Sequence, residues 1–151
     1  MDRGLPRMID ISDKQPSRRE ARAAVCLRCC ATVVEQLRGG GLEKGDALAA
    51  ARLAGISAAK NTHALIPLCH PLPVDFADVE FELREDGVHI RTLVKCRAAT
   101  GVEMEALTAA AVAALTLYDM CKPLGPDMVI TDLRLLQKSG GRHDYRREDD
   151  A

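Results

Sequence analysis

The residues best suited to chemistry flank one apolar stretch, which runs from Thr100 to Lys122. Two carboxylates, Glu103 and Glu105, lie before its alanine-rich centre, where a helix N-terminus favours anions. Asp119 and Lys122 follow the centre three residues apart, so they share one face of a last helical turn. Acids and a base in such places can move protons or hold a charged ligand. A core helix with solvated ends, dipole compensation and one ordinary ion pair is the alternative interpretation.

The element between these groups is predicted to be a helix that is buried all round. From Ala106 to Met120 nearly every residue is apolar or small, and only Thr108, Thr116 and Asp119 interrupt the run. An amphipathic surface helix would show one polar face, which this stretch lacks. The many alanines would let neighbouring backbones approach closely. A buried helix with ionisable ends suggests a site.

A second helix is predicted to follow Asp46, its N-cap, and to run to about Lys60. Lys44 lies just before the N-terminus of this helix, where the helix dipole disfavours a cation. An anionic ligand could be held there by the lysine together with the free N–H groups. An exposed loop lysine is the alternative. Lys60 falls in the last turn, where a cation suits the helix dipole on structural grounds alone.

The segment LIPLCHPLP, from Leu65 to Pro73, contains three prolines and is predicted to be a stiff loop. His70 lies directly before Pro71, so its backbone is restricted and its imidazole is presented in a set direction. A rigid scaffold is what a positioned acid, base or ligand-binding group requires, and an incidental loop histidine is the alternative. The remaining histidines lack such a scaffold and are assigned no role: His63, His89 and His143.

Composition limits the class of protein. The 151 residues suffice for one domain, residues 1–151, of which 1–7 and 142–151 are expected to be flexible. Aromatic residues make up 3% of the chain and Trp is absent, so the core must be aliphatic. A net charge of -1 gives no electrostatic argument for nucleic acid or an anionic membrane surface. No signal peptide and no uncharged apolar run of about 20 residues occurs, which predicts a cytoplasmic protein.

Six cysteines include a CxxC formed by Cys26 and Cys29, with Cys30 beside it. A zinc site would normally need a second CxxC or a histidine pair, and a redox CxxC would begin a helix after a strand. Neither context is clear. Free cysteines in the cytosol usually act as small buried hydrophobic residues, so we predict a structural role and no metal site, with metal or redox chemistry as the alternative.

The order of the predicted elements indicates an α+β fold. It runs strand, helix, helix, hairpin, buried helix, strand, which is typical of a ferredoxin-like antiparallel sheet with helices on one face. Such a sheet leaves its other face exposed or paired with another subunit, so oligomerisation is expected. The underlying segments, besides the helices above, are Met8–Ser12 (alternating, on a sheet edge or a partner subunit), Arg19–Arg28 (helix or strand), Ala31–Leu37 followed by three glycines, Val79–Leu83 and Val88–Thr92 around an Asp-Gly turn, and Met128–Leu136.

Most of the chain resembles one family, the cyclic pyranopterin monophosphate synthases, also called molybdenum cofactor biosynthesis protein C. Two motifs carry the resemblance most specifically, LIPLCHPL and TGVEMEALTAAAVAALTLYDMCK. Further matches are Met8–Ser12, Lys44–Asp46, Ala51–Ile56, Val129–Ile130, Arg134–Leu136 and Lys138–Gly141.

The resemblance implies the second step of molybdenum cofactor synthesis. In this lyase reaction the cyclic dihydro-GTP intermediate, 3′,8-cyclo-7,8-dihydroguanosine triphosphate, becomes cyclic pyranopterin monophosphate with loss of pyrophosphate. The substrate would come from an upstream radical SAM enzyme. The family forms homohexamers, which are trimers of dimers with pockets at subunit interfaces. No tightly bound cofactor is implied, and Mg²⁺ could accompany the triphosphate.

The family's site residues carry over to matching positions, with Asp119 as the assigned active-site residue. Further polar positions with catalytic roles are Lys44, Lys60, His70, Glu103, Glu105 and Lys122. Substrate-binding positions are Leu68, Cys69, His70, Met104, Glu105 and Lys138. These residue types suit the reaction, because lysines can neutralise a departing pyrophosphate while the acids and the histidine move the protons that ring opening and closure require.

The spacing of two of these residues raises a question of reach. Glu105 and Asp119 lie 14 positions apart, which is about 21 Å on one straight helix. That is too far for both to act on one small molecule. Either the GVEME segment bends off the helix, or one site combines the two ends from different subunits. The second option agrees with the implied interface pocket.

The tail departs from the family pattern. The family usually continues Lys-Ser-Gly-Gly with Lys-Ser-Gly and an aromatic residue, whereas Gly141 is followed here by Arg142-His143-Asp144-Tyr145. Arg142 could stand in for the lysine, and the role of the loop is left open.

Two other functions are alternatives. A non-catalytic nucleotide-binding scaffold of the same fold is the main alternative, and the retained motif residues outside the tail count against it. A nucleic-acid-binding module would need a basic surface and aromatic residues on the sheet, which this chain lacks.

Overall fold

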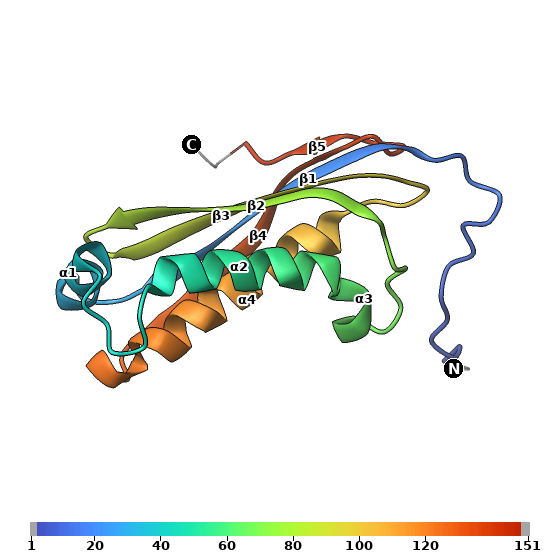
Figure 1. The fold of residues 1–151 in the computed structure, drawn as a ribbon. Helices are drawn as coiled ribbons and strands as arrows, with labels where there is room; N and C mark the ends of the chain where they lie inside the picture. Colours follow the sequence, from blue (N-terminus) through green and yellow to red (C-terminus); the bar gives the residue numbers. More distant parts are fainter. Residues whose placement is uncertain (1–2, 149–151) are drawn as a thin grey trace.

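The computed structural model describes residues 3–148 as one antiparallel five-stranded sheet with its helices on one face (Figure 1). The strand order is β2-β3-β1-β4-β5. Without β5 this is the order of a ferredoxin-like fold, so the predicted α+β class is confirmed. The elements are β1 (Ser17–Arg28), α1 (Ala31–Gly39), α2 (Ala47–Lys60), α3 (Thr62–Leu65), β2 (Val74–Arg84), β3 (Gly87–Ala98), α4 (Glu103–Cys121), a 3-10 turn η1 (Lys122–Leu124), β4 (Val129–Ser139) and β5 (Tyr145–Arg146).

The segment Arg19–Arg28, which the sequence left as helix or strand, is part of the central strand β1. The odd positions Ala21, Ala23, Val25 and Leu27 belong to the core between sheet and helices, since a strand turns alternate side chains to the same face. Ala24 and Cys26 are buried as well, on the other face of the strand. β1 pairs with β3 on one side and with β4 on the other. Pairing on both sides accounts for a strand in a segment whose short apolar centre allowed either choice.

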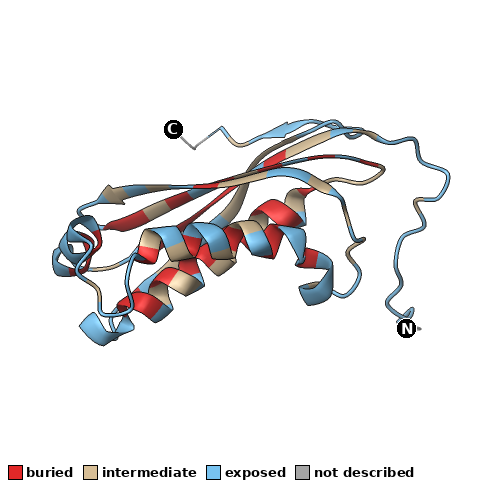
Figure 2. Ribbon diagram, in the orientation of Figure 1, coloured by how far each residue is buried: buried red, intermediate tan, exposed pale blue. Residues whose placement is uncertain are grey.

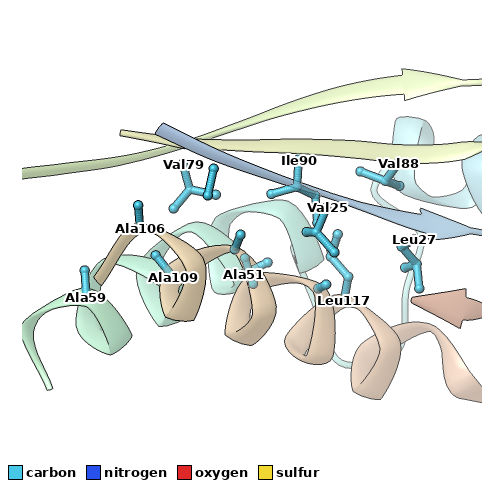
Figure 3. Close-up of a cluster of buried hydrophobic side chains, with 14 of the residues drawn as sticks. Val25, Leu27, Ala51, Ala59, Val79, Val88, Ile90, Ala106, Ala109 and Leu117 are labelled. Carbon is cyan, nitrogen blue, oxygen red and sulfur yellow. The ribbon is translucent and has the colours of Figure 1, made fainter. Parts of the chain in front are cut away.

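The core between sheet and helices is aliphatic, as the composition predicted. No aromatic residue belongs to the buried cluster among the described residues, and Phe81 and Tyr118 pack only at its edge. Figure 3 shows valine, leucine and isoleucine side chains of the strands meeting alanines and one leucine of the helices. The labelled members are Val25, Leu27, Val79, Val88 and Ile90 from strands and Ala51, Ala59, Ala106, Ala109 and Leu117 from helices.

Small residues let α2 and α4 pack closely side by side. A Cβ added at Gly55 of α2 would lie 2.8 Å from Cγ2 of Val79 and 3.0 Å from the carbonyl oxygen of Ala109 on α4. No side chain fits there. The Asp46 N-cap that starts α2 is confirmed, because its carboxylate accepts a 3.0 Å hydrogen bond from the N–H of Ala49.

The helix α4 is continuous from Glu103 to Cys121. The GVEME segment therefore does not bend away from it, and one of the two explanations for the reach problem is excluded. The prediction that the helix is buried all round is wrong for the single chain. Figure 2 shows buried residues only along part of α4, and Leu115 on its outer side is 58% exposed. The apolar residues of α4 therefore continue onto a face of the helix that no other part of the described chain covers.

By length and composition alone, the span Glu103–Leu124 could cross a membrane, with a mean hydropathy of 1.3. Half of the most apolar 18-residue stretch of this span is buried inside the protein. A core helix passes the same test, and the packing of α4 against the sheet and α2 explains its apolar composition.

The sheet face opposite the helices is charged, which corrects the argument for oligomerisation. Because side chains alternate along a strand, the even positions of β1 and their partners on β3 share this face. They include Arg18, Glu20, Arg22, Arg91, Lys95 and Arg97. This face does not need cover on hydrophobic grounds. Exposed apolar side chains on the helical layer include Leu53, Leu65, Met104 and Leu115, while Phe76, Val129 and Leu133 are exposed on strands.

The ends of the chain also differ from expectation. Met8–Ser12 forms no strand and lies outside the sheet. The tail expected to be flexible from residue 142 contains β5, which pairs with β4 through Lys138 and Tyr145, and Arg147 donates to the carbonyl oxygen of Leu136. The last core strand is also shifted toward the C-terminus, since β4 covers Val129–Ser139. The expected flexible positions 1–2 and 149–151 lie outside the described residues.

Candidate active site

The structure divides the predicted site residues between the two ends of α4. We call Lys44, Asp119 and Lys122 the Asp119 end. The Glu105 end comprises Leu68, Cys69, His70, Glu103, Met104, Glu105 and Lys138. Because Glu103 to Cys121 is one helix, the two ends are about 21 Å apart within the chain.

At the Asp119 end, one carboxylate lies between two lysines. Nζ of Lys122 is 2.8 Å from Oδ1 of Asp119, and Nζ of Lys44 is 2.9 Å from Oδ2. The hydrogen bonds from Lys122 and then Lys44 lower the pKa of Asp119 to about 2. Asp119 in turn raises the pKa of Lys122. The side chains are about half exposed, so this is a solvent-accessible cationic pair around a firmly ionised acid.

The lysine of the loop before α2 reaches Asp119 because α2 and α4 run in opposite directions. Lys44 precedes the start of α2 and meets the C-terminal turn of α4. Gly55, in the middle of α2, packs against Ala109 in the first half of α4. Lys60, at the far end of α2, therefore lies toward the Glu105 end. It is not among the residues lining the two cavities described below.

At the Glu105 end, the buried acid Glu105 lies two positions after Glu103, which forms an ion pair. Glu103 accepts from Lys138 of β4, with Oε1 3.0 Å from Nζ. Glu105 is 4% exposed. Burial, and to a lesser degree the charge of Glu103, raises the pKa of Glu105 to about 7. A carboxyl group that titrates near neutral pH can both give and take a proton.

Glu105 and the proline-rich loop line a cavity of about 210 Å³ at this end. The loop contributes Leu68, Cys69 and His70 to its wall, and α4 contributes Met104. Burial, and then the charge of Glu105, raises the pKa of the Cys69 thiol. Nε2 of His70 donates a 2.8 Å hydrogen bond to the carbonyl oxygen of Ile9. The motif LIPLCHPLP thus contributes one wall of the cavity.

A second hollow of about 480 Å³ adjoins the first. The two share Lys14, Thr100, Gly101 and Glu103. The cations around the second hollow are Lys14, Arg19, Lys138 and Arg142. Sequence reasoning missed Lys14 and Arg19. For Lys14 the available signal was its place directly after the matched segment Met8–Ser12.

The cysteine group lies elsewhere. Cys26 is buried on β1, and its Sγ lies 3.1 Å from Nδ1 of His89. Burial raises the pKa of Cys29 to about 11 and also raises that of Cys26. Within residues 3–148, no three His, Cys, Asp or Glu side chains are grouped so that they could hold a metal ion. Cys26 and Cys29 are buried or half-buried, as a structural role requires, whereas Cys30 is exposed.

Fold and site together define a class: ferredoxin-like α+β proteins whose one long core helix carries ionisable groups at both ends. The chain belongs to the MoaC family, whose model matches residues 8–141. Every predicted site residue lies inside that range, which confirms the family resemblance found in the sequence.

Three curated relatives are named as cyclic pyranopterin monophosphate synthases. The chain is 44% identical over 146 residues to a cyclic pyranopterin monophosphate synthase of Peptoclostridium acidaminophilum, covering 96% of this chain and 93% of that protein. It is 53% identical over 145 residues to the synthase of Streptomyces griseus subsp. griseus, covering 95% and 82%. It is 52% identical over 141 residues to cyclic pyranopterin monophosphate synthase 2 of Mycobacterium bovis, covering 93% and 84%.

Proposed function

We propose that this protein converts 3′,8-cyclo-7,8-dihydroguanosine triphosphate to cyclic pyranopterin monophosphate with release of pyrophosphate, a step of molybdenum cofactor biosynthesis. The observation that carries the proposal is the family match over residues 8–141, at 44 to 53% identity to relatives named for this product. The charges at both ends of α4 suit a triphosphate substrate.

The lysines are assigned to the phosphates. At the Asp119 end, Lys44 and Lys122 place two ammonium groups within 3 Å of the same carboxylate. At the Glu105 end, Lys138 is paired with Glu103. A pyrophosphate leaving group gains negative charge as its bond breaks, and fixed cations stabilise that charge. Lys60 would add a further cation at the end of α2.

Glu105 is assigned to proton transfer. Its carboxyl group is buried and has a pKa of about 7, whereas a solvated glutamic acid is ionised well below neutral pH. Opening a purine and closing a pterin requires protons to be delivered and removed in turn. A group that is half protonated near pH 7 can serve both steps.

Asp119 can act as a base only after the substrate has displaced its two lysine partners. With both lysines in place its pKa is about 2, so it is a poor base at neutral pH. An incoming triphosphate would compete for Lys122 and Lys44. Withdrawal of those cations would raise the pKa of Asp119 toward its ordinary value and release it for catalysis. The ion cluster is therefore proposed as the resting form of the site.

The proposed assembly is a homohexamer, a trimer of dimers, with each pocket formed at a subunit interface. Three observations support it: the apolar side chains exposed on the helical layer, the continuity of α4, and the separation of its two charged ends. One small molecule cannot span about 21 Å. Pairing the Glu105 end of one chain with the Asp119 end of another would place both acids around one substrate.

The proposed enzyme needs neither a macromolecular partner nor a bound cofactor. It would act in the cytoplasm on a small molecule supplied by the upstream radical SAM enzyme, without nucleic acid or membrane as partner. No tightly bound cofactor is proposed. Mg²⁺ carried on the triphosphate would be part of the substrate.

The purified protein and the product of the upstream radical enzyme provide the test. Pterin fluorescence and pyrophosphate should both appear, and the Asp119→Asn variant should produce neither. If the wild-type chain binds the nucleotide without forming pterin or pyrophosphate, the non-catalytic scaffold is the better description.

A further inference from the structure

The cavity at the Glu105 end is partly roofed by the chain segment that precedes β1. We call residues 8–14 the N-terminal strap. Ile9, Ile11 and Lys14 of this strap line the cavity opposite Leu68 and His70. The strap has no helix or strand and contributes no rung to the sheet. The strap must therefore be held over the cavity by contacts other than those of the sheet and the helices.

The strap has internal order. Oδ1 of Asp10 accepts from the N–H of Ser12 at 2.9 Å and from its hydroxyl at 2.6 Å. The N–H of Lys14 donates to the carbonyl oxygen of Ile11 at 3.1 Å. These short-range bonds form a compact turn, so the position of Lys14 follows the position of Ile9.

His70 supplies the tie between this turn and the protein body. The hydrogen bond from Nε2 of His70 to the carbonyl oxygen of Ile9 joins the strap to the rest of the chain. A carbonyl only accepts, so Nε2 must carry the hydrogen. Ile9 itself is 70% exposed, so packing contributes little at this point.

The strap ends at a lysine that both hollows share. Lys14, like Glu103, lines both the 210 Å³ cavity and the 480 Å³ hollow. The second hollow also contains Lys138 and Arg142. A cation at this boundary would meet any anionic group that extends from one hollow into the other.

We propose that the N-terminal strap is a latch, that His70 is the positioning residue which closes it, and that the closed latch places Lys14 over the bound substrate. This inference rests on the proposed function for the identity of the ligand, but the latch itself does not depend on that function. In this role His70 affects activity by holding the strap closed, with Nε2 as the hydrogen-bond donor.

Limited trypsin digestion tests the latch without any substrate, because Arg7 and Lys14 are cleavage sites at the two borders of the strap. His70→Leu removes the donor and should raise the rate of cleavage after Lys14 about threefold or more, since proteolysis follows the population of the open form. His70→Gln keeps an N–H donor at a similar reach and should stay protected. His63→Leu on α3 is the matched control and should behave like wild type.

Turnover adds a second arm. The His70→Gln variant should retain at least about tenfold more activity than His70→Leu, because glutamine can hold the strap but cannot act as an acid or base at neutral pH. The latch is overturned if His70→Leu is cleaved no faster than wild type, or if the leucine and glutamine variants are cleaved alike. A protected His70→Gln variant as inactive as His70→Leu would overturn the positioning role.

Discussion

The Asp119 end and the Glu105 end of α4 carry the same kind of side chain in opposite environments. Asp119 is 53% exposed and held by two lysines, and its pKa falls to about 2. Glu105 is 4% exposed, and its pKa rises to about 7. One carboxyl group is stabilised as an anion by neighbours, while the other is destabilised as an anion by the loss of water.

This difference separates two ways of building a reactive acid. The exposed end depends on charges that a substrate can displace, so its chemistry is switched by binding. The buried end depends on the packing of β3, α4 and the proline-rich loop, so its chemistry is set when the chain folds. The comparison predicts that substitutions at the exposed end affect activity alone, whereas those at the buried end affect both activity and stability.

The largest expected effect is that of Asp119→Asn on turnover. The change is nearly isosteric but removes a charge and a proton acceptor, and product formation should fall by about 10²–10⁴-fold. The folded structure should persist, because the side chain is exposed and makes no core contact. Pterin fluorescence after a fixed time and a thermal unfolding curve measure the two properties. Retention of more than about a tenth of wild-type turnover would rule out a catalytic role.

Glu105→Gln should change the stability of the protein with pH. Because the pKa of Glu105 is about 7 in the folded state and 4.5 is its ordinary value, folding favours the protonated acid. Stability from this group is fully present below pH 4.5 and is lost as the pH rises to about 7. At pH 8 the variant should exceed wild type by up to about 3 kcal/mol, at 1.36 kcal/mol per pKa unit. Urea unfolding at pH 4.5 and pH 8 checks this, and a constant difference between the two would contradict it.

Gly55→Ala tests the packing that keeps the two ends at a fixed separation. The new Cβ would meet Val79 and the Ala109 carbonyl at 3.0 Å or less. Overpacking of this kind costs about 1–3 kcal/mol, which exceeds the gain of up to about 1 kcal/mol from helix propensity. Ser57→Ala, at an exposed polar position of the same helix, should change the unfolding free energy by less than about 0.5 kcal/mol. Equal effects of the two substitutions would be inconsistent with this packing.

The smallest effect concerns the Glu103–Lys138 ion pair. Its groups are 3.0 Å apart and 27% and 40% exposed. A double-mutant cycle with Glu103→Gln and Lys138→Met should give a coupling of about 0.2–1 kcal/mol in stability, and less at high salt. A coupling of several kcal/mol would show that the pair belongs to the buried part of the site.

Local signals in the sequence predicted much of the fold because their physical causes are local. The Asp46 cap, the Gly40 helix end and the Asp86-Gly87 turn each depend on a few neighbouring residues. Segments whose structure depends on distant partners were harder. Arg19–Arg28 became a strand through pairing on both sides, and residue 145 joined the sheet through β4.

The candidate site likewise combines features that local sequence could predict with features that depend on distant contacts. Motifs identified Asp119, Lys122, His70 and Glu105 by their positions in the chain. Sequence alone could not show that Lys44 contacts Asp119 across 75 positions. Nor could it show that Lys14 reaches both hollows, because the course of the strap depends on a bond to His70. The buried state of Glu105, and therefore its pKa, also required the packed structure.

The central claim is that one pocket combines the two ends of α4 from different chains. Mixing inactive Glu105→Gln with inactive Asp119→Asn, with subunit exchange verified by mass, tests it directly. In random dimers with two shared sites, mixed dimers have one fully native site, so the mixture should recover about a quarter of wild-type turnover. A mixture that stays as inactive as its parents would contradict the shared pocket.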